Sequence, residues 1–391
     1  MDRICDYNDC TGCALCTAVC PKSCISMKEG GLGHLYPVID PASCIDCGAC
    51  TGACPANSCR PGGRTSRAFS SPVSAYAAWA KDESEYMTST SGGAASVLGR
   101  HVISRGGVVY GSAFCPGDPS EGRPFAVRHI RVENEAGLQK LKGSKYVQSS
   151  IAEILPSLKE DVRSGRLVLF IGTPCQAAAV RCMFGKRPEN LLLVDIVCHG
   201  VPSLSFLTGY VKDNLHIPPE NVLSLSFRGE DGFCMKIGGP EVSYSHRPLS
   251  GRRTEDLYYN LFMDAFTYRE SCYRCLFAGD RRISDMTVGD FWGLGKDVPE
   301  HPYGVSLILP VSPAGENLVS ALKDNMEIFG RPVAEAVSGN EQLRSPRHKS
   351  MRIKIFRKLF PVFGLKVYYL LVMDWIIRKR LASQTGIKTR I

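Results

Sequence analysis

The sequence predicts a small α+β domain at the N-terminus, then an α/β domain that contains a βαβ unit, and a basic amphipathic helix at the C-terminus. Three observations carry this prediction. Cysteine runs repeat within residues 1–60, apolar strands alternate with helical stretches across residues 73–345, and basic and apolar residues alternate within 346–391. Residues 61–72 are rich in Pro, Gly and Ser, so we expect them to link the first two parts.

The unusual feature of the composition is the number of cysteines, 18 in a chain of 391 residues. The N-terminus has no charged start followed by an apolar stretch and a small-residue cleavage site. We therefore expect a cytoplasmic protein whose thiols stay reduced. In such a protein, clustered cysteines indicate metal ligands rather than disulfides.

The net charge of +9 is concentrated near the C-terminus. Residues 341–391 hold thirteen Lys and Arg side chains against Glu341 and Asp374, which leaves the preceding part of the chain close to neutral. Because the body of the protein carries no basic excess, we do not expect it to bind nucleic acid.

Two cysteine runs in the first 60 residues share the spacing C-x2-C-x2-C-x3-C-P. This is the spacing of bacterial ferredoxins, in which three close thiolates bind one [4Fe–4S] cluster and the fourth binds the other cluster. We therefore predict a ferredoxin-like domain with two clusters. A zinc site is the alternative, but one tetrahedral ion does not account for two repeated runs. The predicted ligands are Cys10, Cys13, Cys16 and Cys54 for one cluster, and Cys20, Cys44, Cys47 and Cys50 for the second.

A βαβ unit is predicted in the second domain, from a strand over 167–171, a helix over 176–184 and a strand over 191–197. Cys175 and Cys198 follow the two strands. The carboxyl ends of parallel strands meet at one edge of a sheet, where open α/β sheets bind ligands, so we expect these two cysteines to lie close together. Further helices are predicted over 94–104, 135–141 and 151–164, and further strands over 107–110 and from 285.

A C-x2-C pair, Cys272 and Cys275, lies further along the chain. With Cys175 and Cys198 it makes four thiolates, which suits a third [4Fe–4S] cluster or, as the alternative, a structural zinc ion. We favour the cluster because the chain already carries iron–sulfur ligands.

Six motifs occur in a fixed order across about residues 73–310. They are Ser91-Gly-Gly93, Lys142-Gly-Ser-Lys-Tyr146, Gly172-Thr-Pro-Cys175, Cys198-His-Gly-Val-Pro202, Cys272-x2-Cys275 and Asp285-x4-Asp290-Phe-Trp292. Together they resemble the beta subunit of coenzyme F-420 hydrogenase and dehydrogenase, a family that includes the plant 7-hydroxymethyl chlorophyll a reductase.

The resemblance implies an α/β flavin-binding catalytic domain with FAD beside its own [4Fe–4S] cluster. By that resemblance Cys175, Cys198, Cys272 and Cys275 would hold the cluster, and FAD would be held by Ser91, Gly92, Gly93, Lys142, Gly143, Ser144, Lys145, Tyr146 and Thr173. A Gly-Gly turn before a helix offers N–H donors to a pyrophosphate, whereas no G-x-G-x-x-G follows a strand to support a Rossmann site. His199, next to a predicted ligand, is a candidate proton donor or a structural histidine.

The leading hypothesis is an enzyme that passes electrons between its clusters and FAD, to or from a small-molecule substrate or a deazaflavin-type coenzyme. Its redox partner would be a ferredoxin, a deazaflavin or another reductase. The alternative is an electron-transfer subunit for a partner enzyme, for example in polysaccharide biosynthesis, with no substrate of its own.

The C-terminal segment alternates basic and apolar residues over 351–360 and is mostly apolar over 363–377. The apolar stretch is too short and too interrupted to span a bilayer, which takes about 20 apolar residues. Two interpretations stay open. The segment lies on an anionic membrane face, so that the protein is peripheral on the inner membrane, or it packs on the body or an acidic partner.

Overall fold

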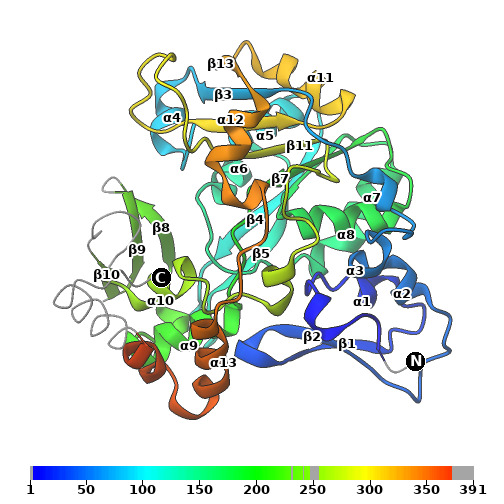
Figure 1. The fold of residues 1–391 in the computed structure, drawn as a ribbon, viewed down its shortest axis with the longest axis vertical. Helices are drawn as coiled ribbons and strands as arrows, with labels where there is room; N and C mark the ends of the chain where they lie inside the picture. Colours follow the sequence, from blue (N-terminus) through cyan, green and yellow to red (C-terminus); the bar gives the residue numbers. More distant parts are fainter. Residues whose placement is uncertain (1–2, 230–231, 241, 247–254, 372–391) are drawn as a thin grey trace, which may run out of the picture.

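The computed structural model describes residues 3–229, 232–240, 242–246 and 255–371 (Figure 1). Its N-terminal domain is a small α+β unit in which an antiparallel hairpin accompanies three short helices. The turns that carry the cysteines use left-handed backbone at Gly12 and Gly48, with φ of 66° and 70°, which glycine adopts without strain. The elements are α1 (Leu15–Val19), β1 (Ile25–Glu29), β2 (Leu35–Ile39), α2 (Ala49–Ala53) and α3 (Pro55–Ser58).

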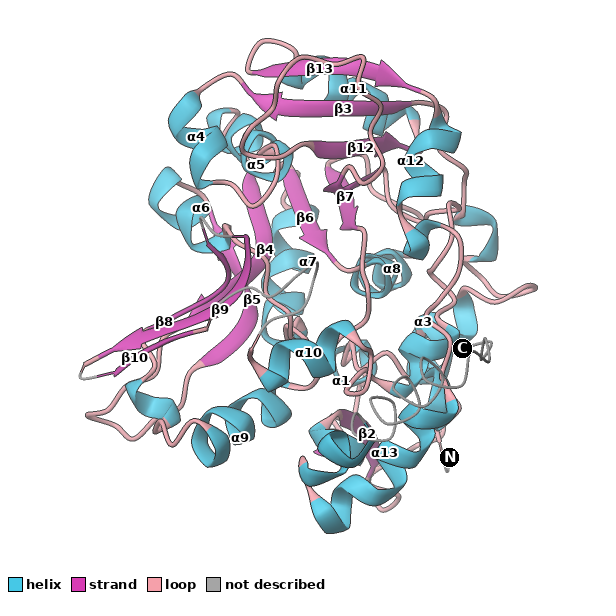
Figure 2. Ribbon diagram, turned by 60° about the vertical axis from the view of Figure 1, so that its left-hand side comes forward, coloured by secondary structure: helices cyan, strands magenta, loops and turns pink. Residues whose placement is uncertain are grey.

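An eight-stranded mixed sheet forms the centre of the second domain, in the order β13-β3-β12-β11-β7-β6-β4-β5 (Figure 2). The four central strands β11, β7, β6 and β4 are parallel, and antiparallel strands extend the sheet on both sides. The strands are β3 (Ala75–Ala80), β4 (Val108–Cys115), β5 (Ala126–Val132), β6 (Val168–Gly172), β7 (Leu191–Ile196), β11 (Met286–Asp290), β12 (Ser306–Pro310) and β13 (Met326–Arg331).

Helices pack on this sheet and on a separate three-stranded antiparallel sheet (Figure 2). The helices are α4 (Glu83–Thr88), α5 (Ala94–Ser104), α6 (Glu135–Leu141), α7 (Leu155–Arg163), α8 (Pro174–Phe184), α9 (Leu204–Asn214), α10 (Leu257–Met263), α11 (Pro313–Leu322), α12 (Val333–Gly339) and α13 (Met351–Phe363). The small sheet consists of β8 (Ser224–Gly229), β9 (Gly232–Gly239) and β10 (Val242–Ser245).

The predicted βαβ unit is present as β6, α8 and β7. The two strands are parallel neighbours, with Val168 opposite Leu191 and Gly172 opposite Asp195. Thr173 caps α8 in a capping box with Gln176, and Pro174 occupies the first helical turn, so the chain turns sharply from strand into helix. The carboxyl ends of β6 and β7 therefore lie side by side, as the sequence predicts.

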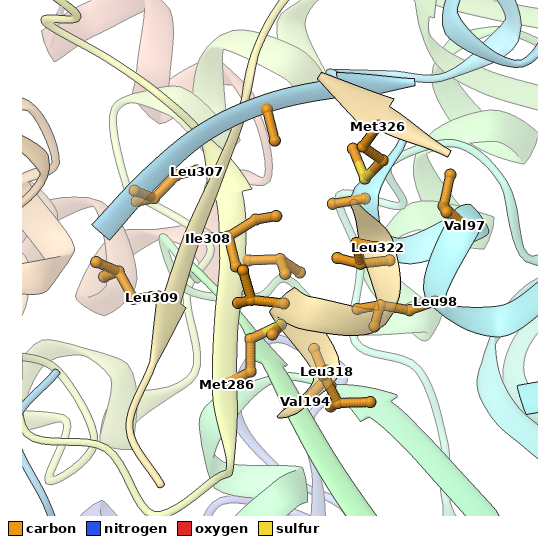
Figure 3. Packing of buried hydrophobic residues seen from close by; sticks show 14 of the residues in the cluster. Val97, Leu98, Val194, Met286, Leu307, Ile308, Leu309, Leu318, Leu322 and Met326 are labelled. Carbon is orange, nitrogen blue, oxygen red and sulfur yellow. The ribbon is translucent and has the colours of Figure 1, made fainter. Parts of the chain in front are cut away.

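The largest buried apolar group fills the space between the sheet and two helices, α5 and α11 (Figure 3). Val97 and Leu98 of α5 and Leu318 and Leu322 of α11 pack there with Ile308 of β12. Helices α7 and α8 pack in a second group with β6, β7 and part of β4. Truncating one such buried leucine to alanine costs about 2–5 kcal/mol.

The N-terminal domain lies against the second domain. Helices α1, α2 and α3 all contact α8 (Figure 1), and Leu15 of α1 is buried in the same apolar group as α7 and α8. The segment 61–72 also contacts the second domain, because Ser70 and Arg282 exchange backbone hydrogen bonds of 2.9 and 2.8 Å.

Helix α13 packs on the body through Ile353 and Phe356, which are 3% and 0% exposed. They share an apolar group with α9, α10 and the small sheet. Among the residues that the structure describes, no helix is long and apolar enough to cross a membrane. The rest of the basic C-terminal segment, from residue 372, lies outside the described residues.

Candidate redox site

Each predicted set of four cysteines in the N-terminal domain lines a cavity of its own. One cavity is lined by the set that combines Cys10, Cys13 and Cys16 with Cys54, and the other by the set that combines Cys44, Cys47 and Cys50 with Cys20. The last cysteine of each run thus crosses to the other group. The same two sets of four were predicted from the spacing.

The two cavities differ in their surroundings. Cys16 and Cys50 are both buried, but Cys47 of the second group is exposed and lies beside Ile45, which is 57% exposed. The first group instead faces the second domain, where the Nε of Arg269 donates to the Cys10 carbonyl oxygen at 2.6 Å. The first group is therefore the inner one, and the second is the outer one.

Among the described residues, no three Cys, His, Asp or Glu side chains gather closely enough to hold a single metal ion. A [4Fe–4S] cluster requires less convergence, because each of its four cysteines binds a different iron.

The third cysteine group assembles from three separate segments. Cys175 lies in the first turn of α8, Cys198 follows β7, and Cys272 lies in the short 3₁₀ helix Glu270–Arg274, just before Cys275. The four are neighbours: after burial, the main cause that raises the pKa of the Cys198 thiol is the proximity of Cys175 and Cys272. The structure thus brings together all four cysteines that the sequence suggested for a third centre.

Burial dominates the chemistry of this third group. It raises the pKa of the Cys272 thiol to about 12 and that of Cys275 to about 11. Arg269 lies close enough to Cys272 to oppose this rise, and Arg282 does the same at Cys275. Four neighbouring, partly buried thiols need nearby positive charge to ionise, which is what bound iron or zinc supplies.

A cavity of about 330 Å³ lies beside this group, at the carboxyl ends of β6, β7 and β11 and against the middle of β4. Its wall includes Cys198, so the third cysteine group and the cavity share a side chain. The first turn of α5 faces the cavity through Ala95 and Ser96. Of the predicted residues, the wall includes Ser91, Gly93, Lys142, Gly143, Ser144, Lys145, Tyr146, Thr173 and His199.

Gly92 is not among the cavity residues. A Cβ atom at this position would come 2.0 Å from the Ala78 carbonyl oxygen and 2.7 Å from the Ser306 backbone nitrogen. Gly92 therefore allows the turn before α5 to pack against β3 and β12. Its role in this structure is to let the backbone of this turn pass close to the backbones of β3 and β12.

The two lysines of the Lys142–Tyr146 motif have different environments. Lys142 Nζ forms an ion pair with Glu85 at 2.9 Å. Lys145 Nζ donates to the Leu141 and Lys142 carbonyl oxygens, and burial lowers its pKa to about 7. Lys145 is thus the lysine without a carboxylate partner among the described residues.

His199 lies in the cavity wall next to Cys198 and is held from the side by Gln342. Gln342 Nε2 donates to His199 Nδ1 at 2.9 Å. Since Nδ1 accepts this hydrogen bond, a neutral His199 carries its proton on Nε2.

Sequence reasoning missed several residues of this wall. Ser112 lies on β4, and its Oγ is buried with no hydrogen-bond partner. The predicted strand over 107–110 stopped short of it. His129 is buried between Ser149 and the Ile171 carbonyl oxygen, and burial lowers its pKa to about 4. Arg228 pairs with Asp290 at 2.5 Å and reaches the wall from β8, which no local pattern indicated.

Two four-cysteine cavities in a domain that packs beside a third cysteine group and a large cavity define an iron–sulfur electron-transfer protein. Comparison with known proteins supports this class. Residues 9–58 match the model of the 4Fe-4S dicluster domain, and residues 165–335 match the model of the C terminus of the coenzyme F420 hydrogenase/dehydrogenase beta subunit. The chain is therefore similar to that family over residues 165–335 and to the dicluster domain over residues 9–58, in agreement with the resemblance and the fused ferredoxin domain predicted from the motifs.

Among solved structures, the chain aligns with a chain of the F420-reducing [NiFe] hydrogenase complex from Methanosarcina barkeri. The two share 17% sequence identity with a TM-score of 0.47, over 71% of this chain and 91% of that chain. No curated protein sequence matches the chain.

Proposed function

We propose that the protein is an iron–sulfur flavoprotein oxidoreductase. It would pass electrons between its ferredoxin-type clusters, a third [4Fe–4S] cluster and FAD, to or from a small-molecule substrate or a deazaflavin-type coenzyme. The observation that carries this proposal is Cys198, which belongs to the third cysteine group and also lines the large cavity. A cofactor in the cavity would therefore lie next to a cluster.

The residues of the cavity fit a flavin nucleotide. Ser112 Oγ is a buried polar atom without a partner, which a bound polar group would satisfy. The N-terminus of α5 and the amine of Lys145 supply N–H donors and positive charge for a phosphate. Gly93, with φ of 86°, leaves the start of α5 without a Cβ atom. When bound, a flavin exchanges two electrons as hydride or one electron at a time.

The third cysteine group fits a [4Fe–4S] cluster through its four sulfur donors. A zinc ion would also accept four thiolates, but it has no redox chemistry and needs them to converge on one point. The four cysteines of this group are partly buried, and Cys198 faces the large cavity, which suits a centre that exchanges electrons with a cofactor there.

His199 would donate a proton to the reduced substrate from the cavity wall. The contact from Gln342 places the proton of a neutral His199 on Nε2. Replacing His199 with Ala should slow substrate turnover and leave photoreduction of the flavin intact. Unchanged turnover would exclude the role of proton donor.

The test of the proposal as a whole is anaerobic purification with iron, sulfide and flavin analysis. Three clusters and a flavin predict about 12 iron atoms and one FAD per chain. About eight iron atoms without FAD would reduce the function to that of a two-cluster ferredoxin. Lys145→Met should lower the FAD content, whereas Lys81→Met, at an exposed lysine outside the cavity, serves as the matched control.

A second candidate function is electron transfer to or from a partner protein. The exposed Cys47 supports it, because a cluster held there would lie near the surface, within reach of a ferredoxin or another reductase. Both functions share the outer group; they differ in whether the large cavity binds a substrate.

The C-terminal helix supports contact with an anionic membrane surface. Met351, Val362 and Phe363 are 66%, 76% and 54% exposed, and Lys354 and Lys358 are exposed beside them. An apolar strip flanked by lysines suits a headgroup layer of negative charge. The double variant Lys354→Glu with Lys358→Glu should lose flotation with anionic vesicles. This variant keeps α13, whereas a truncation at residue 350 would remove the buried Ile353 and Phe356.

A further inference from the structure

Arg269 is a buried arginine that joins the inner cysteine group to the third one. Its side chain is 1% exposed, and its backbone oxygen accepts the N–H of Cys272 at 2.9 Å. The guanidinium extends into the N-terminal domain, where Nε donates to the Cys10 carbonyl oxygen at 2.6 Å and Nη2 to the Leu35 carbonyl oxygen at 2.5 Å. One side chain thus touches both domains between their cysteine groups.

No carboxylate among the described residues pairs with this guanidinium. Its other contacts are neutral: Nη1 donates to Gln148 Oε1 at 3.3 Å, and the Tyr36 ring lies under the charge at 4.3 Å. Nη2 also lies 3.5 Å from Cys10 Sγ, a predicted cluster ligand. The closest anion that Arg269 can serve is therefore the thiolate of Cys10.

The other buried arginine in this part of the protein has a different environment. Arg282 forms an ion pair with Asp195 at 2.6 Å, with both side chains at most 2% exposed. The charge of Arg282 is thus compensated by protein, while that of Arg269 is not. A buried charge without a counter-charge is costly, so it indicates a negative group that the protein is built to hold.

We infer that the fixed positive charge of Arg269 favours reduction of the inner cluster over reduction of the outer cluster. The inner cluster is the one held by Cys10, Cys13, Cys16 and Cys54. Arg269 is thus a positioning residue that determines which of the two clusters holds the electron. Uptake of one electron from a ferredoxin-type donor adds one negative charge to the cluster and breaks no bond. A neighbouring cation stabilises that charge, particularly where water is excluded. Electrons that reach the outer cluster are then drawn inward, toward the third cysteine group. The inference rests on the proposed function only in requiring that the cysteine groups hold clusters.

The test is an EPR-monitored redox titration of the full chain, with the outer cluster as the internal reference. Arg269→Met should lower the ratio of reduced inner to reduced outer cluster about tenfold, which is about 59 mV for a one-electron couple. Gln148→Glu should shift the ratio in the same direction, because a carboxylate at this position compensates the charge while Arg269 keeps its bonds to Cys10 and Leu35. Arg269→Lys, which retains a cation, should shift it less than Arg269→Met does.

Gln148→Glu keeps the test decisive even where Arg269→Met fails to fold. An unchanged ratio in Gln148→Glu, with both clusters present, overturns the inference. Iron analysis separates this result from failure of the proposed function. Fewer than about eight iron atoms in the unmodified chain would contradict the clusters themselves, whereas a full complement with unshifted potentials contradicts only the role of Arg269.

Discussion

The inner and outer cysteine groups of the N-terminal domain share one sequence motif but differ in their exposure and in their contacts with the second domain. The outer group ends at the surface with Cys47 exposed. The inner group is closed by the second domain, which contributes Arg269 at Cys10 and Gln148, whose Nε2 donates to the Thr11 carbonyl oxygen at 2.9 Å. The motif therefore predicts the ligands, but the tertiary contacts decide which cysteine group reaches the surface and which faces the interior.

The difference predicts that losing a ligand on the inner side has the larger consequence. Cys16→Ser and Cys47→Ser should each remove about four iron atoms per chain. Cys16 lies in α1, which contacts α7 and α8, so Cys16→Ser should also loosen the second domain. Iron analysis and limited proteolysis of both variants check this. Equal protease resistance of the second domain in the two variants would contradict the inner and outer assignment.

The next effect concerns the buried ion pair beside the third cysteine group. Arg282 donates to the Phe277 and Gly279 carbonyl oxygens after Cys275, and Asp195 neutralises it. Asp195→Asn leaves a buried charge without its partner, so the free energy of unfolding should fall by about 3–5 kcal/mol. Chemical denaturation measures the change. Glu121→Gln is the control because this surface pair with Arg123 should contribute at most about 1 kcal/mol.

The comparison also separates what the sequence could predict from what it could not. The spacing of the two runs placed the fourth cysteine of each in the opposite group, because a cubane fixes its ligands locally. The βαβ pattern brought Cys175 and Cys198 to one edge of the sheet, because strand order and handedness follow general rules. Motif order then led to the residues around the large cavity.

The contacts that distinguish the inner group from the outer one were not predictable in this way. Arg269 and Leu35 are 234 positions apart in the chain, and no periodicity signals their contact. Lys142, one of the residues that the resemblance implies for FAD, pairs with Glu85 from α4, and no local pattern indicated this ion pair. Ser112 was missed because the end of a strand is poorly marked in sequence. Such contacts depend on how domains and loops pack, which one chain's local pattern does not encode.

A moderate effect should come from Ser203, which links the domains on the inner side. Its Oγ donates to the Leu32 carbonyl oxygen at 2.6 Å and accepts the N–H of Phe206 at the start of α9. Ser203→Ala should lower the free energy of unfolding by about 1–2 kcal/mol and increase amide exchange in the loop around Leu32. Asn134→Ala removes the cap of α6, far from this contact, and should leave that exchange unchanged.

The smallest effect is a pH dependence on the same side of the domain. His34 is fully buried, its Nε2 lies 3.2 Å from the Thr267 carbonyl oxygen, and burial followed by the charge of Arg269 lowers its pKa to about 3. Since an unfolded histidine titrates near 6.5, the unfolded state binds more protons between about pH 3 and 6.5, so stability falls as the pH drops through this range.

His34→Gln removes that proton while its amide can still reach Thr267. Between pH 6 and pH 5 the unmodified protein should therefore lose more stability than the variant, by at most about 1.4 kcal/mol, in anaerobic denaturation. His129, whose pKa burial lowers to about 4, contributes equally to both proteins and cancels in the difference. Parallel pH profiles would mean that His34 is not kept neutral by the docked second domain. The inner side would then be less tightly closed than its contacts with Arg269 and Thr267 indicate.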